Sequence, residues 1–222
     1  MPNHSKAIDR PQSLGEEIAN AISHGLGFLL ALASLPILVW QANRLGGAVD
    51  IVAACVFSLT MMLLYGVSTL YHALPMSRAG RAKAWLQRLD HAAIYLFIAG
   101  SYTPFTLGVL HGGWGWTLFC AVWATAAFGV TVKLLNRLRH PWLSTGLYVA
   151  MGWMALLAAP VLFERLPAAG LAWLVVGGIS YTLGAVVFLF DNKVRYAHFV
   201  WHLFVLGGSV CHFFAALLYA RA

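Results

Sequence analysis

The sequence His198-Phe-Val-Trp-His202 opens an apolar run that continues to Tyr219. Two histidines four residues apart lie on one face of an α-helix, one turn above the other. The run is long enough for a helix that crosses a bilayer. Because ionisable side chains are costly at the mouth of a membrane span, this pair indicates a functional site.

The composition of the whole chain agrees with insertion into a membrane. Of the 222 residues, 61% are hydrophobic and only 9% are charged, whereas a soluble domain averages about 25% charged residues. The formal net charge of +7 raises nucleic acid as a partner, but the basic residues fall in short clusters between apolar runs. Membrane topology explains such clusters better than nucleic-acid binding does. We therefore expect an integral membrane protein whose partners are membrane lipids and not nucleic acid.

Charge-free runs predict seven membrane spans. The run between Asp90 and Lys133 is too long for one span. The sequence His111-Gly-Gly-Trp-Gly divides it, because glycines and interfacial tryptophans mark turns at the membrane surface. The other five spans are residues 18–43, 51–77, 141–163, 166–190 and 196–219. The expected fold is all-α, a polytopic seven-transmembrane helix bundle, with residues 1–17 as a cytoplasmic tail and 18–220 as a single membrane domain.

The distribution of Lys and Arg over the loops predicts the orientation. With seven spans, eleven basic residues fall on the N-terminal side and three on the other side. Because basic loops stay in the cytoplasm, we expect a cytoplasmic N-terminus and a C-terminus outside. The N-terminal side carries Lys6, Arg10, Arg78, Arg81, Lys83, Arg88, Lys133, Arg137, Arg139, Lys193 and Arg195, and the other side carries Arg44, Arg165 and Arg221.

This topology places polar residues of several spans at the same depth. His72 lies near the cytoplasmic end of the second span, Asp90 opens the third, and His198 and His202 open the seventh. Neutral imidazole is a good Zn²⁺ ligand, and three protein ligands plus a water form an open, catalytic site. We therefore predict that His72, His198 and His202 bind Zn²⁺.

Two further residues suit catalysis at such a site. Asp90 is placed to bond the zinc-bound water as a general base, and Ser68, one turn before His72, can orient a ligand or the water. Zinc lowers the pKa of a bound water to about 7. A site near the lipid headgroups would then suit hydrolysis of a lipid amide or ester.

Simpler explanations stand beside these assignments. The histidine pair can snorkel to the interface, Asp90 can cap the third span, and Ser68 can pack between helices. A stripe of Glu17, Asn20 and His24 runs along the first span. Its first two residues can be helix caps. The residues do not settle the roles of this stripe or of His91. We read His212, about 15 Å beyond His202 along the helix, as an interhelical hydrogen bonder.

These motifs together resemble the signature of the haemolysin III branch of the progestin and adipoQ receptor family, which belongs to a wider superfamily with alkaline ceramidases. The resemblance covers all seven predicted spans. It implies a zinc site with three histidine ligands, a nearby Asp that contacts the zinc-bound water, and a cytoplasmic N-terminus. The short termini suit a bacterial member in the inner (plasma) membrane. The matching residues are Ser68-x-x-x-His72, Asp90, His198-x-x-x-His202, Glu17-x-x-Asn20-x-x-x-His24 and the run Arg88–Tyr95.

Three functions are compatible with these residues. The first is a zinc-dependent hydrolase that acts on a small lipid-like substrate and takes part in membrane lipid homeostasis. The second is a non-enzymatic sensor or receptor of membrane lipids, in which zinc is structural. The third is a pore-forming, haemolysin-like protein, although no predicted span carries a polar stripe through both leaflets. The sequence leaves the substrate, the oligomeric state and the occurrence of catalysis open.

Overall fold

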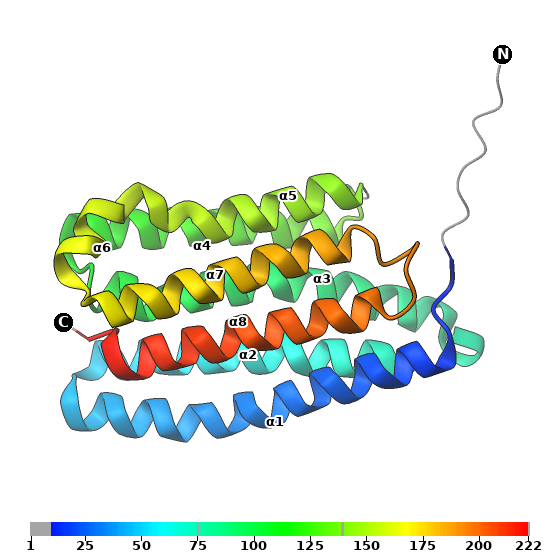
Figure 1. Ribbon diagram of the computed structural model, residues 1–222, viewed down its shortest axis with the longest axis horizontal. Helices are drawn as coiled ribbons and strands as arrows, with labels where there is room; N and C mark the ends of the chain where they lie inside the picture. Colours follow the sequence, from blue (N-terminus) through cyan, green and yellow to red (C-terminus); the bar gives the residue numbers. More distant parts are fainter. Residues whose placement is uncertain (1–9, 75, 139, 222) are drawn as a thin grey trace, which may run out of the picture.

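The structure is a computed structural model that describes residues 10–74, 76–138 and 140–221, with the backbone alone at 76–79. Within these residues every regular element is a helix, as predicted (Figure 1). Lys6 and Arg139 of the predicted basic clusters, and residues 1–9 of the predicted tail, lie outside the described residues. The elements are α1 (Leu14–Leu45), α2 (Ala48–Ala73), α3 (Met76–Leu107), α4 (Gly112–Leu134), α5 (Pro141–Gly152), the 3₁₀ helix η1 (Trp153–Ala158), α6 (Ala159–Arg165), α7 (Ala168–Phe188) and α8 (Ala197–Tyr219).

Six helical segments are long and apolar enough to cross a membrane. They are α1, α2, α4, the continuous segment Pro141–Arg165, α7 and α8. Helix α3 is as long as α1. Its first half carries Arg81, Lys83, Arg88 and Asp90, and these charged residues lower its hydropathy. Six candidate spans are thus shown among the described residues, and the crossing by α3 stays a prediction.

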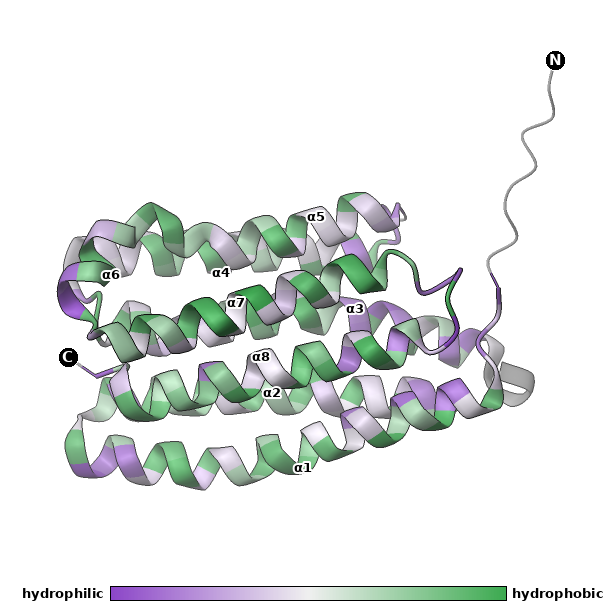
Figure 2. Cartoon of the chain, viewed as in Figure 1, coloured by the Kyte–Doolittle hydropathy of each residue, from purple (hydrophilic) through white to green (hydrophobic). Residues whose placement is uncertain are grey.

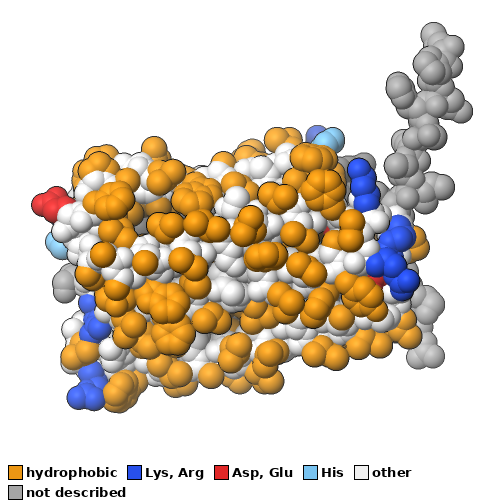
Figure 3. Space-filling model, in the orientation of Figure 1, with side chains coloured by type: hydrophobic (Ala, Val, Ile, Leu, Met, Phe, Trp, Pro, Cys, Tyr) orange, Lys and Arg blue, Asp and Glu red, His pale blue; other side chains and the backbone are white. Residues whose placement is uncertain are grey.

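Helix α2 packs against α1 and α3, α4 packs against α3, and α7 packs against α8. The bundle closes where α8 packs against α1. In Figure 1, α1, α2 and α8 form one side of the bundle, α4, α5 and α6 the other, and α3 and α7 lie between them. Helix α1 begins at the end opposite to the one where α8 ends. Hydrophobic side chains cover the face drawn in Figure 3, and Lys and Arg gather at the two ends. This distribution is the one expected for a bundle surrounded by lipid.

Three helices, α1, α2 and α3, begin earlier than the sequence suggested, and α2 also ends earlier, at Ala73. Ser13 and Glu16 form a capping box, in which each side chain accepts a hydrogen bond from the other residue's backbone N–H, and α1 therefore starts at Leu14. Helix α3 extends back through the predicted basic loop to Met76. Asp90 consequently lies deep inside α3, and it cannot act as the N-cap of this helix.

The fifth predicted span changes its winding part-way. The 3₁₀ helix η1 separates α5 from α6. Pro160 follows directly and has no N–H to donate to the carbonyl one turn before it, so the α-helical hydrogen bonds cannot continue through this point. The interruption places Trp153 and Leu156 beside a cavity that is described below.

Candidate metal centre

Three histidines meet near the N-terminal end of α8. One atom from each of His72, His198 and His202 lies within 4.8 Å of the others, and all three residues are buried. His72 comes from the last turn of α2, and the pair on α8 presents two rings from one helix face. The structure therefore brings together the three residues that the sequence analysis selected as metal ligands.

A carboxylate holds the ring of His72. Its Nδ1 lies 2.6 Å from Oε2 of Glu17, on the first turn of α1. The other oxygen of Glu17 accepts a hydrogen bond of 2.6 Å from Lys83 Nζ, which also donates to the Leu74 carbonyl at 2.9 Å. This connection joins α1, α2 and α3. The sequence pattern indicates only a loop cation at Lys83, yet Lys83 lies seven residues before Asp90, on the same face of a continuous helix.

The two histidines of α8 are oriented in a similar way. Asp191, in the loop between α7 and α8, places Oδ2 2.9 Å from Nδ1 of His198. Ser23 of α1 places its hydroxyl 3.0 Å from Nδ1 of His202. Neither partner was selected from the sequence. Asp191 lies seven residues before His198, and the chain turns back between them through Tyr196, which has a positive φ of 58°.

The opposite ring nitrogens remain available. Nε2 of His72, His198 and His202 is buried in each case and has no hydrogen-bond partner within the described part of the chain. When Nδ1–H donates to a carboxylate, the proton is on Nδ1 and the lone pair is on Nε2. Three buried imidazoles with ligand atoms within 4.8 Å of one another fit a divalent cation such as Zn²⁺, and unpaired nitrogens there otherwise cost desolvation energy.

The other predicted residues lie beside this group. Asp90 is buried, and its Oδ2 has no partner among the described groups. Ser68 is also buried, and its hydroxyl is 2.7 Å from Nδ1 of His24. The His24 ring stacks on His202 with centroids 3.3 Å apart. Asp90 and Ser68 therefore adjoin the histidines, but they are not part of the group of three.

The remaining unassigned residues have structural contacts. Asn20 donates to the side chain of Gln12 at 2.6 Å. The ring of His91 lies against Phe188, with centroids 6.3 Å apart, and its carbonyl accepts from Tyr148. Asn20 Oδ1 is buried and has no hydrogen-bond partner among the described residues.

Glu16 fastens the N-terminal arm over this end of the bundle. Its carboxylate accepts two hydrogen bonds from Arg10, at 2.6 and 2.8 Å, and one from the backbone N–H of Tyr196 at 2.8 Å. The hydrogen bonds to Glu16 raise the pKa of Arg10 above its usual value. The arm and the start of α8 are thereby held together two residues before His198.

Comparison with known proteins identifies the family of this chain. Residues 12–213 match the protein family described as "Haemolysin-III related". The chain belongs to the haemolysin III family. It is 42% identical over 207 residues to the "Hemolysin-3 homolog" of Bacillus subtilis (strain 168), covering 93% of this chain and 95% of the relative.

Two further relatives agree with this assignment. The "Hemolysin-3" of Bacillus cereus is 43% identical over 208 residues, which cover 94% of this chain and 93% of the relative. The human "Monocyte to macrophage differentiation factor" is 28% identical over 211 residues, or 92% and 84% of the two chains. No solved structure is significantly similar to the chain. The family predicted from the sequence motifs is therefore confirmed.

Next to the histidines, this haemolysin III protein contains two adjoining apolar cavities. The first, of about 110 Å³, reaches from His24 and Trp201 into the middle of the bundle. The second, of about 140 Å³, continues toward the opposite end, between α3, η1, α6 and α7. Leu156, Phe163 and Val175 line the second cavity and are also exposed on the surface of the bundle. The cavities therefore connect the neighbourhood of the histidines with the lipid-facing surface.

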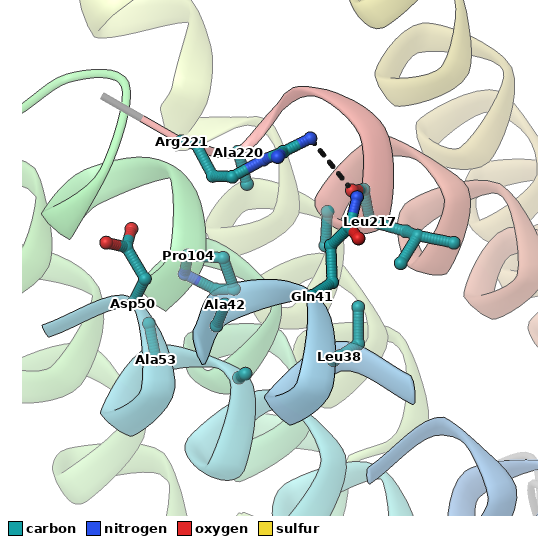
Figure 4. Close-up of a pocket in the computed structure, with 11 residues that line it drawn as sticks. Leu38, Gln41, Ala42, Asp50, Ala53, Pro104, Leu217, Ala220 and Arg221 are labelled. Atoms are coloured by element: carbon teal, nitrogen blue, oxygen red, sulfur yellow. Dashed lines mark hydrogen bonds between the residues drawn. The ribbon is translucent and has the colours of Figure 1, made fainter. Parts of the chain in front are cut away.

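A third cavity lies at the far end of the haemolysin III bundle. Figure 4 shows it between α1, α2 and α8, with Asp50 and Arg221 at its rim and the guanidinium bonded to the Leu217 carbonyl. Its volume is about 30 Å³, which holds a water molecule or two. Figure 2 shows hydrophilic residues along the first turns of α1 and α8, at the end of the bundle opposite to this cavity. Among the described residues, the histidine group that could hold a metal lies at that end.

Proposed function

We propose that this haemolysin III family protein is a zinc-dependent hydrolase of a lipid-derived amide or ester, with a role in membrane lipid homeostasis. His72, His198 and His202 hold Zn²⁺. The observation that carries the proposal is the set of three buried, unpaired Nε2 atoms, each on a ring whose Nδ1 is already engaged. The protein spans the bacterial inner membrane seven times, with its N-terminus in the cytoplasm.

Asp90 and Ser68 supply the acid–base chemistry. Zn²⁺ held by the three histidines would polarise a carbonyl and make water nucleophilic near neutral pH. Asp90 has a free carboxylate oxygen in a buried setting, so it accepts the proton of the attacking water and passes it to the leaving amine or alcohol. The Ser68 hydroxyl lies 2.7 Å from Nδ1 of His24. This contact orients both side chains on the side of the site nearest Asp90. Such acid–base assistance contributes roughly 10²–10⁴-fold to a rate.

The apolar cavities supply the binding of the lipid chain. Their lining is mainly apolar, from Phe97 and Ile98 in the first cavity to Leu171 and Val175 in the second. An acyl chain bound in the cavities would exchange its contacts with water and bilayer lipid for contacts with a fixed apolar surface. The polar end of the lipid would remain beside the histidines. The proposed substrate is therefore a long-chain lipid with a hydrolysable bond at its polar end.

Metal quantification tests the centre, and lipid hydrolysis tests the reaction. The wild-type protein should hold close to one Zn²⁺ per chain, His72→Ala should lose it, and His140→Ala, an exposed histidine outside the site, should retain it. Asp90→Asn should keep the metal and lose release of fatty acid from extracted bacterial lipids. Wild-type protein without stoichiometric metal, or full hydrolysis by His202→Ala, would refute the proposal.

A non-enzymatic lipid sensor is the second candidate, and one observation favours it. The partners of the three rings come from α1 and from the loop before α8, so a bound metal would clamp α1, α2 and α8 together. In this case Asp90→Asn leaves function in cells intact, while loss of a histidine unfolds the bundle. The name of the Bacillus cereus relative raises a pore as the third candidate. Single-channel recordings with His72→Ala as the control test it.

A further inference from the structure

His212 is a buried histidine that the metal centre does not use. It lies on α8 ten residues after His202, which places it about 15 Å farther along the helix. Both of its ring nitrogens are buried and have no hydrogen-bond partner among the described residues. Among the described residues, the ring therefore does not form the interhelical hydrogen bond that the sequence predicts for it. The Leu174 carbonyl approaches the ring, but the pair does not meet hydrogen-bond geometry.

Close packing against α7 fixes the position of this ring. A Cβ on Gly177 would lie 2.4 Å from Cδ2 and 2.7 Å from Nε2 of His212, which real side chains essentially never tolerate. Tyr181 contacts the ring edge-on, with centroids 5.2 Å apart. Helix α7 thus fixes the imidazole by close packing on one side, while the ring nitrogens have no hydrogen-bond partner among the described residues.

The ring lies where the two apolar cavities meet. His212 lines both cavities. Other polar groups at this junction are already satisfied: Ser101 donates to the Ile98 carbonyl, and Tyr102 donates to Gly152 and accepts from the backbone of Ala155. Within the described chain, His212 therefore offers the unsatisfied polar atoms at the junction.

Two more lining residues have unpaired polar atoms, but they lie elsewhere. His24 Nε2 and Thr145 Oγ1 line only the first cavity. His24 also stacks on His202, so it belongs to the neighbourhood of the metal centre. A ligand that fills both cavities consequently meets polar atoms at two separate depths.

The chemistry of neutral imidazole determines what can bind at the junction. Such a ring always has one acceptor nitrogen, which needs a donor from its partner. Backbone carbonyls such as that of Leu174 cannot donate. A hydroxyl can both donate to the acceptor nitrogen and accept from the other N–H, and it can be carried into the bilayer on a lipid chain.

We propose that His212 binds a hydroxyl group on the chain of a long-chain lipid, about 15 Å from the metal centre. The ligand class is a hydroxylated fatty acyl lipid, with its polar end at the histidines and its hydroxyl at the junction of the cavities. The inference rests on the part of the proposed function that places a lipid chain in the cavities, and not on hydrolysis.

Binding of hydroxystearic acids tests the inference directly. The full chain, loaded with Zn²⁺ in nanodiscs, is titrated with stearic acid and with isomers that carry the hydroxyl at successive carbons. One hydrogen bond changes affinity by roughly 2–10-fold. The wild type should prefer one position, or two adjacent positions, by this factor over stearic acid. His212→Leu should lose the preference but bind stearic acid as well as the wild type or better.

Controls separate this effect from misfolding. His212→Gln keeps hydrogen-bonding atoms and should retain a preference, and His140→Leu, which lies outside the cavities, should behave as the wild type. Metal content reports on the integrity of each variant. A wild type without positional preference overturns the inference whatever the variants do, and so does a preference that survives in His212→Leu.

Failure of this inference can be told apart from failure of the proposed function. If no lipid is hydrolysed but the wild type shows a preference that His212→Leu abolishes, the hydrolase proposal fails and the hydroxyl site stands. If Asp90→Asn abolishes hydrolysis but hydroxyl position has no effect on wild-type binding, the hydroxyl site fails alone.

Discussion

Glu17 Oε2 lies 2.6 Å from Nδ1 of His72, so the first helix holds a predicted metal ligand of the second. The same carboxylate is 2.6 Å from Lys83 Nζ on the third helix. One acidic side chain therefore fixes the tautomer of a histidine and neutralises a buried cation. This double role makes Glu17 sensitive to substitution in two measurable ways.

Glu17→Gln is expected to weaken metal binding by about 10–100-fold, because the amide cannot polarise the ring of His72 as a carboxylate does. Competition with a metal-binding dye on the purified protein measures this change. Glu164→Gln, an exposed glutamate at the other end of the bundle, is the matched control and should leave the affinity unchanged. Equal affinities in both variants would remove Glu17 from the metal centre.

Lys83→Met should destabilise the bundle by about 3 kcal/mol, because the Lys83 ammonium group is buried and its removal leaves Glu17 without its cationic partner. Thermal unfolding in detergent reports the loss. The exposed neighbour Arg81 provides the comparison, since Arg81→Met should change stability by no more than about 0.5 kcal/mol. Similar melting temperatures for the two variants would show that the buried pair contributes no net stability.

The main features of the fold and of the metal group could be predicted from sequence for simple physical reasons. The spacing of His198 and His202 fixes their common face, and the charge bias over the loops places His72 at the same end. The hydrogen-bond partners of these rings could not be predicted from the sequence. Lys83 becomes relevant only because α3 continues beyond the predicted span, and Asp191 depends on the course of a loop. Ser23 is a small hydroxyl that sequence alone cannot distinguish from a packing residue.

Removal of metal should lower the stability of the protein. A ligand present at a hundred times its Kd stabilises the state that binds it by about 2.7 kcal/mol. A strong chelator is therefore expected to lower the melting temperature of wild-type protein and to leave a His72→Ala/His198→Ala double variant unaffected. Re-addition of Zn²⁺ should restore the wild-type value. A chelator effect of equal size in the double variant would place the responsible metal elsewhere.

Two glycines of α1 offer a sharper test of how packing supports the histidines. A Cβ on Gly27 would lie 2.6 Å from the ring of Tyr65, whereas a Cβ on Gly25 would make an ordinary contact of 3.7 Å with Thr69. The Tyr65 ring cannot move aside freely, because its hydroxyl is bonded to Ser209 at 2.7 Å. It also meets His24 edge-on, with centroids 4.9 Å apart.

Gly27→Ala should therefore cost about 1–3 kcal/mol through overpacking and should displace Tyr65 toward His24, which stacks on His202. Metal affinity is expected to fall together with the melting temperature. Gly25→Ala should preserve both, and it controls for the general effect of replacing glycine in this helix. A loss of stability in Gly27→Ala without any change in metal affinity would show that Tyr65 supports the bundle but does not position the histidines.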